Sequence, residues 1–234
     1  MKITTFCTFV ISLILSGCST HMSKVEYEGT GSGSPESQDK VNQVIVTDQR
    51  GTESNWLGAI RGGYGNRLKT LRTEESTDII VDKIYTDALG KSGILTDSKD
   101  APYQLHVVIT KFDCSYYFNR EAHAHVEVSL IENESLKPRF SKSYKTDETE
   151  GGVGAGIFGD VDTLRDLAEG AMNKTVDKML GDQEFIDALE IEVVKSRDPT
   201  DTSSRLEEIE SLHEDGLLSE EEYQKKRAEI ISNL

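Results

Sequence analysis

Three residues in one polar series have the types and the spacing that could do chemistry. His123, His125 and Glu127 occupy alternate positions, and apolar residues fill the positions between them. In a β-strand this alternation places all three on one face, where His106 could join them from a neighbouring strand. Two imidazoles and a carboxylate are donors that zinc accepts. A solvated polar face explains the same residues more simply, so the sequence alone predicts no metal ligand.

A glycine-rich segment raises the question of a nucleotide cofactor. Residues 154–159 read GAGIFG, which fits the pattern Gly-x-Gly-x-x-Gly, and a helix is predicted after them. The dinucleotide motif follows a buried parallel strand and faces phosphate groups. Here the preceding stretch is polar, and acidic neighbours such as Glu150 and Asp160 would repel phosphate. We therefore expect no cofactor. Because the histidines support no Ser-His-Asp or Cys-His arrangement, we also expect no enzymatic activity.

Cys18 suggests covalent attachment of a lipid. The apolar run over residues 6–15 is far shorter than the roughly 20 residues of a membrane span, so residues 1–17 are predicted to be a signal peptide. The run closes with Leu-Ser-Gly-Cys, which resembles the lipobox of bacterial lipoproteins. The resemblance implies a lipidated Cys18 thiol, cleavage before it, and acylation (palmitate) of the new amino terminus. Ser19 in the next position implies an outer-membrane protein on the periplasmic face. The alternative is a plain secretory signal with an incidental cysteine.

The composition restricts the partners of the chain. A formal net charge of −16 and a pI near 4.7 leave no basic stripe to neutralise phosphates, so we expect no nucleic acid partner. The same charge repels anionic headgroups, so contact with the membrane is expected through the lipid on Cys18. With Cys7 removed and Cys18 acylated, Cys114 has no partner for an intramolecular disulfide and is predicted to be a small buried side chain.

The rest of the chain divides by composition. Residues 18–40 are rich in Gly, Ser, Pro and charge and are predicted to form a flexible, lipidated tether. Residues 41–190 are predicted to form one α+β domain, a β-α-β-β-β-α two-layer sandwich of antiparallel strands with both helices on one face. The expected strands are 41–46, 103–114, 120–132 and 137–148, and the expected helices are 74–93, 160–180 and 182–190. Residues 47–73 are expected to be a loop-rich stretch.

Two motifs in residues 41–180 resemble the YajG-like lipoprotein family. The first is Asp48 with Arg50, and the second is a loop containing Leu57, Gly58, Arg61, Gly63, Tyr64, Gly65 and Asn66. The resemblance implies an auxiliary lipoprotein of the cell envelope without catalytic residues. We expect the loop to present Trp56, Arg61 and Tyr64 at its tip as partner-binding residues. Alternatively, the loop folds back and closes the sheet.

After a linker over residues 191–203, residues 204–234 are predicted to form a helical hairpin. Asp215-Gly216 makes the turn, and Ser219 with Glu222 forms a capping box. The hairpin resembles the SHOCT short C-terminal domain, which implies oligomerisation or association with another protein. Docking back onto its own domain is the alternative. The apolar candidates for partner binding are Leu206, Ile209, Leu212, Leu218, Tyr223 and Ile230.

The sequence therefore predicts a non-enzymatic, lipid-anchored envelope protein that acts as an accessory or scaffold subunit. Its partners would be the membrane, through Cys18, and either an envelope protein or further copies of itself. The alternative is a lipoprotein that binds a metal, an envelope lipid or a glycan through the polar face of its sheet.

Overall fold

The computed structural model describes residues 19–29, 38–151, 160–190, 206, 209–213 and 218–232. The chain divides into two compact units, Met1–Ile191 and Glu192–Leu234, which are described separately. The predicted signal peptide, Cys18, the GAGIFG segment and the linker lie outside the described residues. No helix in the described ranges is long and apolar enough to cross a membrane.

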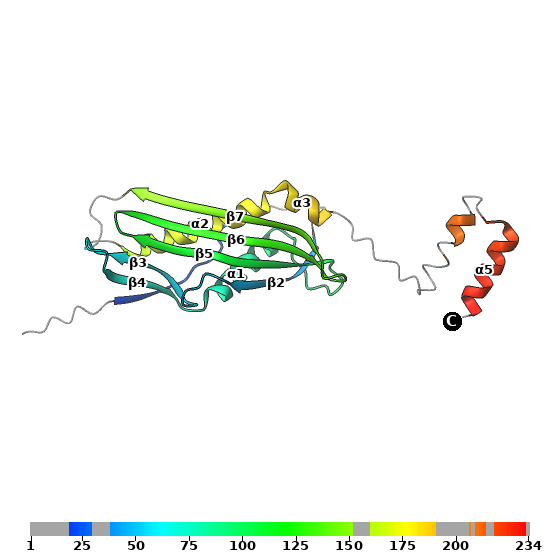
Figure 1. Ribbon diagram of the computed structural model, residues 1–234, viewed down its shortest axis with the longest axis horizontal. Helices are drawn as coiled ribbons and strands as arrows, with labels where there is room; N and C mark the ends of the chain where they lie inside the picture. Colours follow the sequence, from blue (N-terminus) through cyan, green and yellow to red (C-terminus); the bar gives the residue numbers. More distant parts are fainter. Residues whose placement is uncertain are drawn as a thin grey trace, which may run out of the picture. The chain divides into compact units, whose positions relative to one another are not determined.

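The first unit is built on one seven-stranded sheet (Figure 1). Its strands follow the order β1-β4-β3-β5-β6-β7. Strand β2 lies off this path: β2 pairs with the first half of β5, and β3 pairs with the last residues of β5. The strands are β1 (Ser19–Ser23), β2 (Val41–Asp48), β3 (Trp56–Arg61), β4 (Arg67–Thr73), β5 (Tyr103–Tyr116), β6 (Asn119–Glu132) and β7 (Pro138–Gly151).

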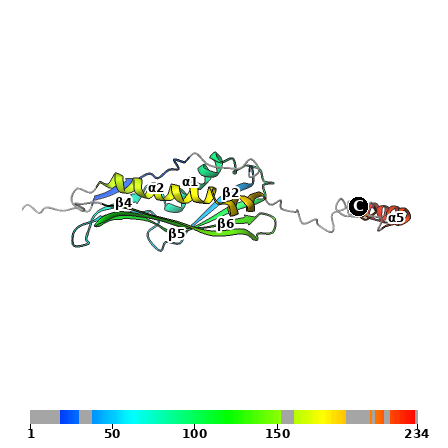
Figure 2. The same ribbon diagram turned by 90° about the horizontal axis from the view of Figure 1, so that it is seen from above.

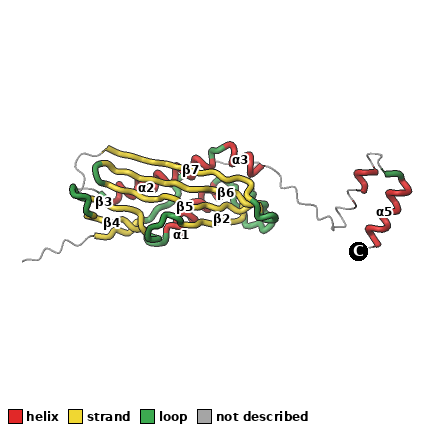
Figure 3. The backbone as a smooth tube through the Cα atoms, viewed as in Figure 1, coloured by secondary structure: helices red, strands yellow, loops and turns green. Residues whose placement is uncertain are grey.

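The helices α1 (Thr77–Lys91), α2 (Val161–Leu180) and α3 (Gln183–Glu190) complete this unit. Figure 2 shows α1 and α2 on one face of the sheet, and Figure 3 shows the same division between helix and strand. Helix α1 buries Ile80, Ile84 and Ala88, which share one helical face. The N-cap of α2 is Asp160, whose side chain accepts a hydrogen bond from the Asp162 amide. The predicted α+β class with two layers is confirmed.

Strands β5, β6 and β7 form the antiparallel part of the sheet that the sequence predicts. Alternate residues of β6, from Ala122 to Leu130, are buried under the helices, as the alternating pattern requires. His123, His125 and Glu127 lie on the opposite face. Both ladders of β6 run along its whole length, so β6 is held on both sides.

The predicted loop-rich stretch over residues 47–73 also contains the strands β3 and β4, which the sequence pattern did not predict. These two strands form an antiparallel hairpin, whereas β3 and β2 run parallel to β5. The prediction of antiparallel strands alone is therefore wrong. Strand β4 is polar in sequence, but it pairs with β3 on one side and with β1 on the other. These backbone hydrogen bonds and the burial of Leu71 hold it in the sheet.

The predicted tether is wrong for residues 19–29, which are part of the folded unit. Residues 19–23 are strand β1, and Val25 and Tyr27 are buried. The Tyr27 hydroxyl donates to Asp177 of α2 at 2.8 Å, and Lys91 of α1 donates to the Tyr27 carbonyl at 3.0 Å. Two apolar side chains thus fix a segment whose composition alone suggests disorder. We call residues 24–29 the strap.

One buried arginine joins the two parallel ladders on the edge of β5. The pairing of β2 with β5 ends at Ile109 of β5, and the pairing of β3 with β5 begins at Cys114 of β5. At this break Arg50 donates to the carbonyl oxygens of Trp56 at 2.7 Å and Phe112 at 2.8 Å. Asp48 accepts two further hydrogen bonds from the same guanidinium, at 2.8 and 2.9 Å. The Asp48 and Arg50 motif therefore has a structural role at the change of strand partner.

The second unit contains a helical stretch over residues 209–213 and helix α5 (Glu220–Ser232). The predicted capping box is present: the Ser219 amide donates to Glu222 at 3.1 Å, and the Glu222 amide donates to the Ser219 hydroxyl at 3.4 Å. His213 stacks on Tyr223 with ring centroids 4.7 Å apart. These contacts hold the two helical segments together.

Candidate functional site

One end of the sheet gathers exposed aromatic side chains. The β3–β4 loop (residues 62–66) and the β5–β6 turn (Tyr117 and Phe118) meet there, since the Tyr117 hydroxyl donates to the Gly63 carbonyl at 3.1 Å. Strand β1 also begins at this end, because Ser19 pairs with Lys69 near the start of β4 (Figure 1). We call the loop, the turn and the start of β1 the aromatic end.

The aromatic end presents apolar surface outward. Tyr64 is fully exposed and the side chain of Phe118 is 68% exposed. The Tyr117 and Phe118 rings lie 4.1 Å apart. The loop is closed below Tyr64 by a hydrogen bond from the Gly62 amide to the Asn66 carbonyl at 2.8 Å. Gly65 adopts a left-handed φ of 79°, which a larger residue would adopt only under strain. Tyr64 is therefore held away from the fold by the loop itself.

Three basic residues lie at the aromatic end, together with acidic residues such as Glu121 and Glu150. Arg61 donates to the Gly65 carbonyl at 3.2 Å at the base of the loop. Arg120, two residues after Phe118, pairs with Glu150 at 3.4 Å. Lys69 lies opposite Ser19 in the β1–β4 ladder. Aromatic rings beside Arg and Lys are the combination found at membrane interfaces.

The structure separates the three residues predicted at the loop tip. Tyr64 lies at the tip and Arg61 at its base, whereas Trp56 begins β3. The Trp56 ring is half-buried, with the guanidinium of Arg67 at 4.5 Å and that of Arg72 at 5.7 Å from its centroid. The prediction of Trp56 at the tip is wrong, because Trp56 is the first residue of β3 and the rest of that strand lies between it and the loop.

Sequence reasoning missed Tyr117 and Phe118. The available signal was a pair of aromatic residues in a short turn between two strongly alternating strands, where turn residues are usually Gly, Asn, Asp or Pro. The hydroxyl contact between Tyr117 and the β3–β4 loop joins segments far apart in sequence, and no local pattern contains it.

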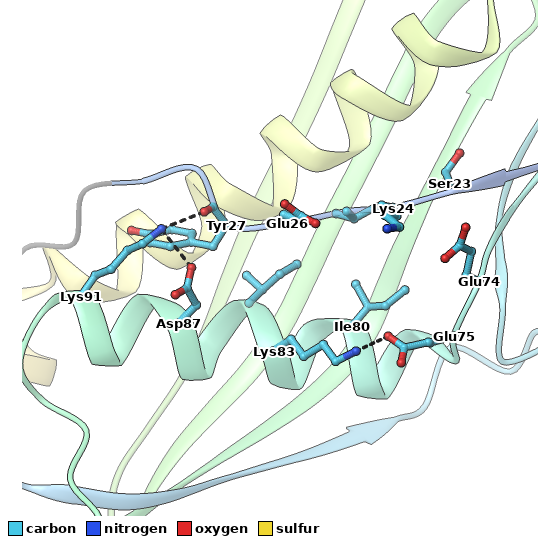
Figure 4. A pocket seen from close by; sticks show the side chains of 12 residues that line it. Ser23, Lys24, Glu26, Tyr27, Glu74, Glu75, Ile80, Lys83, Asp87 and Lys91 are labelled. Atoms are coloured by element: carbon cyan, nitrogen blue, oxygen red, sulfur yellow. Dashed lines mark hydrogen bonds and ion pairs between the residues drawn. The ribbon is translucent and has the colours of Figure 1, made fainter.

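A pocket of about 650 Å³ lies between the strap and α1 (Figure 4). Lys83 pairs with Glu75 across its edge, and Lys91 pairs with Asp87 at 2.9 Å. Lys91 also binds the strap through the Tyr27 carbonyl. Because these cations already have protein partners, we assign the pocket to seating the strap. No local pattern in the sequence indicates this pocket, because residues 24–29 fall within the predicted tether.

The polar sheet face brings two of the predicted histidines to a carboxylate. His123 Nδ1 and His125 Nε2 lie 2.5 and 2.8 Å from the same Asp147 oxygen. Hydrogen bonds from the two imidazoles lower the pKa of Asp147 to about 2. This carboxylate comes from β7 rather than from Glu127. His106 faces Ser129 in the ladder, away from the two histidines.

The apolar residues of the hairpin fall into two groups. Ile209 and Ile230 are buried within the second unit. The others are partly exposed: Leu206, Leu212, Leu218 and Tyr223. The second group leaves apolar surface available for contact with another protein.

Comparisons with known proteins give the family and the fold. The model of a family described as uncharacterized lipoprotein matches residues 31–190. Protein XCC0632 from Xanthomonas campestris shares the fold at a TM-score of 0.51 and 12% identity, covering 72% of this chain and 96% of its own. PelC from Paraburkholderia phytofirmans, solved as a dodecamer, gives a TM-score of 0.37 at 14% identity over 66% of this chain and 96% of its own. A search of curated proteins gave no match. Because the family model covers more than half of the chain, the chain belongs to this family of uncharacterized lipoproteins.

Proposed function

We propose that this protein is a non-enzymatic, lipid-anchored accessory protein of the cell envelope whose aromatic end rests on the bilayer. Lipid on Cys18 holds it to the membrane, and the C-terminal hairpin associates with an envelope partner or with further copies of the chain. Ser19 directly after the lipidated cysteine supports a location at the outer membrane, on its periplasmic face.

The pairing of Ser19 with Lys69 carries this proposal. Cys18 is bonded directly to Ser19, and one residue of chain spans at most about 3.6 Å. A lipid on Cys18 would therefore enter the bilayer beside the first residue of β1. The exposed Tyr64 and Phe118 belong to the same end of the sheet, so the anchor would bring them to the headgroups.

The chemistry of the aromatic end suits that position. Tyrosine has an apolar ring and a polar hydroxyl, and such side chains concentrate at the boundary between acyl chains and headgroups. Phe118 adds apolar surface that is 68% exposed. Two or more acyl chains supply the stable attachment that one chain lacks. The aromatic end would then orient the domain rather than anchor it.

Two features support association through the hairpin. A unit of about 40 residues or fewer rarely buries enough surface to be stable without a partner, and this unit buries Ile209 and Ile230. Leu212 and Tyr223 remain partly exposed, as an interface requires. The resemblance to SHOCT domains points the same way.

Hydrogen exchange on the lipidated protein in vesicles tests the orientation. We expect slower exchange of amides in residues 62–66 and 117–119 than in a chain that begins at Ser19 and carries no lipid. The β6–β7 turn, residues 133–137, lies at the other end of the sheet and is the internal control. Protection of the control turn, or no protection at the aromatic end, would refute the orientation.

Association has its own test. Removal of residues 204–234 from the lipidated chain should lower the mass of the complexes recovered by in-cell crosslinking. The full chain with Leu206→Asp and Leu212→Asp is the matched variant, because it keeps the capping box of Ser219 and Glu222 and the stacking of His213 on Tyr223. If both variants give the same crosslinked complexes as the wild type, the hairpin is not the association element.

A further inference from the structure

The face of the sheet opposite α1 and α2 carries a compact group of potential metal ligands. His123 and His125 come from β6, and Asp147 comes from β7, where it pairs directly with His123. Their ligand atoms all lie within 4.8 Å of one another. The imidazole side chains are 22% and 20% exposed and the carboxylate is 58% exposed. An ion could therefore reach all three without opening the fold.

The spacing is close to what zinc requires. Zinc binds imidazole nitrogen at about 2.0–2.1 Å and carboxylate oxygen at a similar distance, so neighbouring ligands in a tetrahedron lie about 3.3 Å apart. The Asp147 oxygen lies 2.5 Å from His123 Nδ1 and 2.8 Å from His125 Nε2. Each of these two separations needs to open by less than about 1 Å. The two imidazole nitrogens lie within 4.8 Å of each other and need to close by at most about 1.5 Å, and side-chain rotations supply both changes.

The backbone beneath the group is held on both sides. His123 pairs with Asp113 of β5 as well as with Asp147, and His125 pairs with Lys111 and Lys145. Thr110 also donates to the His125 carbonyl at 3.1 Å. Ligands on paired strands keep their spacing better than ligands on loops.

The surrounding charges are mixed, but the chain favours a cation. Lys111 and Lys145 are the cations beside His125, whereas Asp113 adds a second carboxylate beside His123. The whole chain carries a net charge of −16, which raises the local concentration of divalent cations. Metal binding would also replace the present arrangement, in which one Asp147 oxygen is hydrogen-bonded to both imidazoles.

We propose that His123, His125 and Asp147 form a zinc-binding site with a fourth position open to water or to a donor from a partner protein. Three protein ligands and one open position are characteristic of accessible zinc sites, whereas buried structural sites use four protein ligands. The site lies on the sheet face and its existence does not depend on the orientation of the aromatic end. Its failure would leave the proposed function untouched.

Calorimetry with zinc on the lipidated full chain in detergent, without a polyhistidine tag, tests the site. We expect one zinc per chain, and affinity lowered at least about 10-fold by each of His123→Ala, His125→Ala and Asp147→Asn. The matched controls on the same face, His106→Ala and Glu127→Gln, should bind as the wild type does. Cobalt should show the visible absorption of tetrahedral coordination in the wild type and lose it in the three ligand variants.

Several results would overturn the proposal. The first is absence of binding, and the second is binding that the three ligand variants leave unchanged, which would mean an adventitious ion only. Loss of binding in Glu127→Gln with retention in Asp147→Asn would also overturn it, since the carboxylate ligand would then be another residue. Thermal unfolding in the presence of a chelator, equal for all variants, establishes that each one is folded.

Discussion

Ser19 pairs with Lys69 at the start of the β1–β4 ladder. The residue that follows the predicted lipidation site is therefore already part of the sheet, at the end where Tyr64 is fully exposed. A flexible tether at this point would let the domain stand at any orientation to a bilayer. A paired strand fixes which end of the domain adjoins the anchor, and this difference underlies the proposed function.

Replacement of Arg50 by lysine should destabilise the first unit by about 2–4 kcal/mol, because lysine keeps the charge but not the planar set of donors. The carbonyls of Trp56 and Phe112 and the carboxylate of Asp48 would lose their common partner. Urea unfolding measures the change. Arg165→Lys is the control, because Arg165 pairs with Asp166 on an exposed helix face, where a loss of less than about 1 kcal/mol is expected. Equal effects of the two substitutions would contradict the role of Arg50.

Acid should weaken the contribution of Asp48 to stability. Burial raises the pKa of Asp48, but the hydrogen bonds and charge of Arg50 outweigh this effect, so the pKa lies below its ordinary value of 3.8. A lowered pKa in the folded state means stability that is present above 3.8 and is lost as the pH falls through the folded value. Urea unfolding across the acid range should show the difference between wild type and Asp48→Asn shrinking below that pH. A difference that stays constant with pH would count against this account.

Gly58 and Gly170 should respond to alanine with opposite signs. A Cβ on Gly58 would lie 2.1 Å from the Cys114 carbonyl oxygen, so Gly58→Ala must displace β3 from β5 and should cost about 1–3 kcal/mol or more. A Cβ on Gly170 meets nothing within 4 Å, and alanine there should stabilise α2 by up to about 1 kcal/mol. Thermal unfolding of both variants decides the point. Gly58→Ala at wild-type stability would show that the two strands are not in this register.

Tyr27 should hold the strap to the helices. Tyr27→Ala removes a buried ring and should destabilise the unit by about 3–5 kcal/mol. Tyr27→Phe keeps the ring, removes the hydroxyl that donates to Asp177, and should cost about 1 kcal/mol. Limited proteolysis should cut residues 24–29 faster in the alanine variant than in the phenylalanine variant. Rapid cutting of the wild type within these residues would restore the tether interpretation.

The sequence predicted those helices and strands whose own residue pattern shows which face is buried. The alternation of β6 from Ala122 to Leu130 and the helical spacing of Ile80, Ile84 and Ala88 each identify a buried face. The capping box at Ser219 was likewise local and was found as predicted.

What the sequence did not predict depends on pairing between distant segments. Strand β1 is polar and short, and it becomes a strand only beside β4. Asp147 meets His123 because the β6–β7 register places them opposite each other, and register is set across strands rather than along one. The contact of Tyr117 with the β3–β4 loop has the same origin. Local residue patterns contain none of these relationships.

Depth-dependent quenching in vesicles tests the central claim most directly. Single cysteines at Tyr64→Cys, Phe118→Cys and Leu136→Cys can each carry a fluorophore on the lipidated protein, since Leu136 is an exposed apolar residue in the β6–β7 turn. Cys114 does not compete for the label, because burial raises the pKa of its thiol and hides it. We predict that brominated lipids quench the labels at positions 64 and 118 and leave the label at 136 bright. Stronger quenching at 136, or equal quenching at all three positions, would contradict a membrane-facing aromatic end.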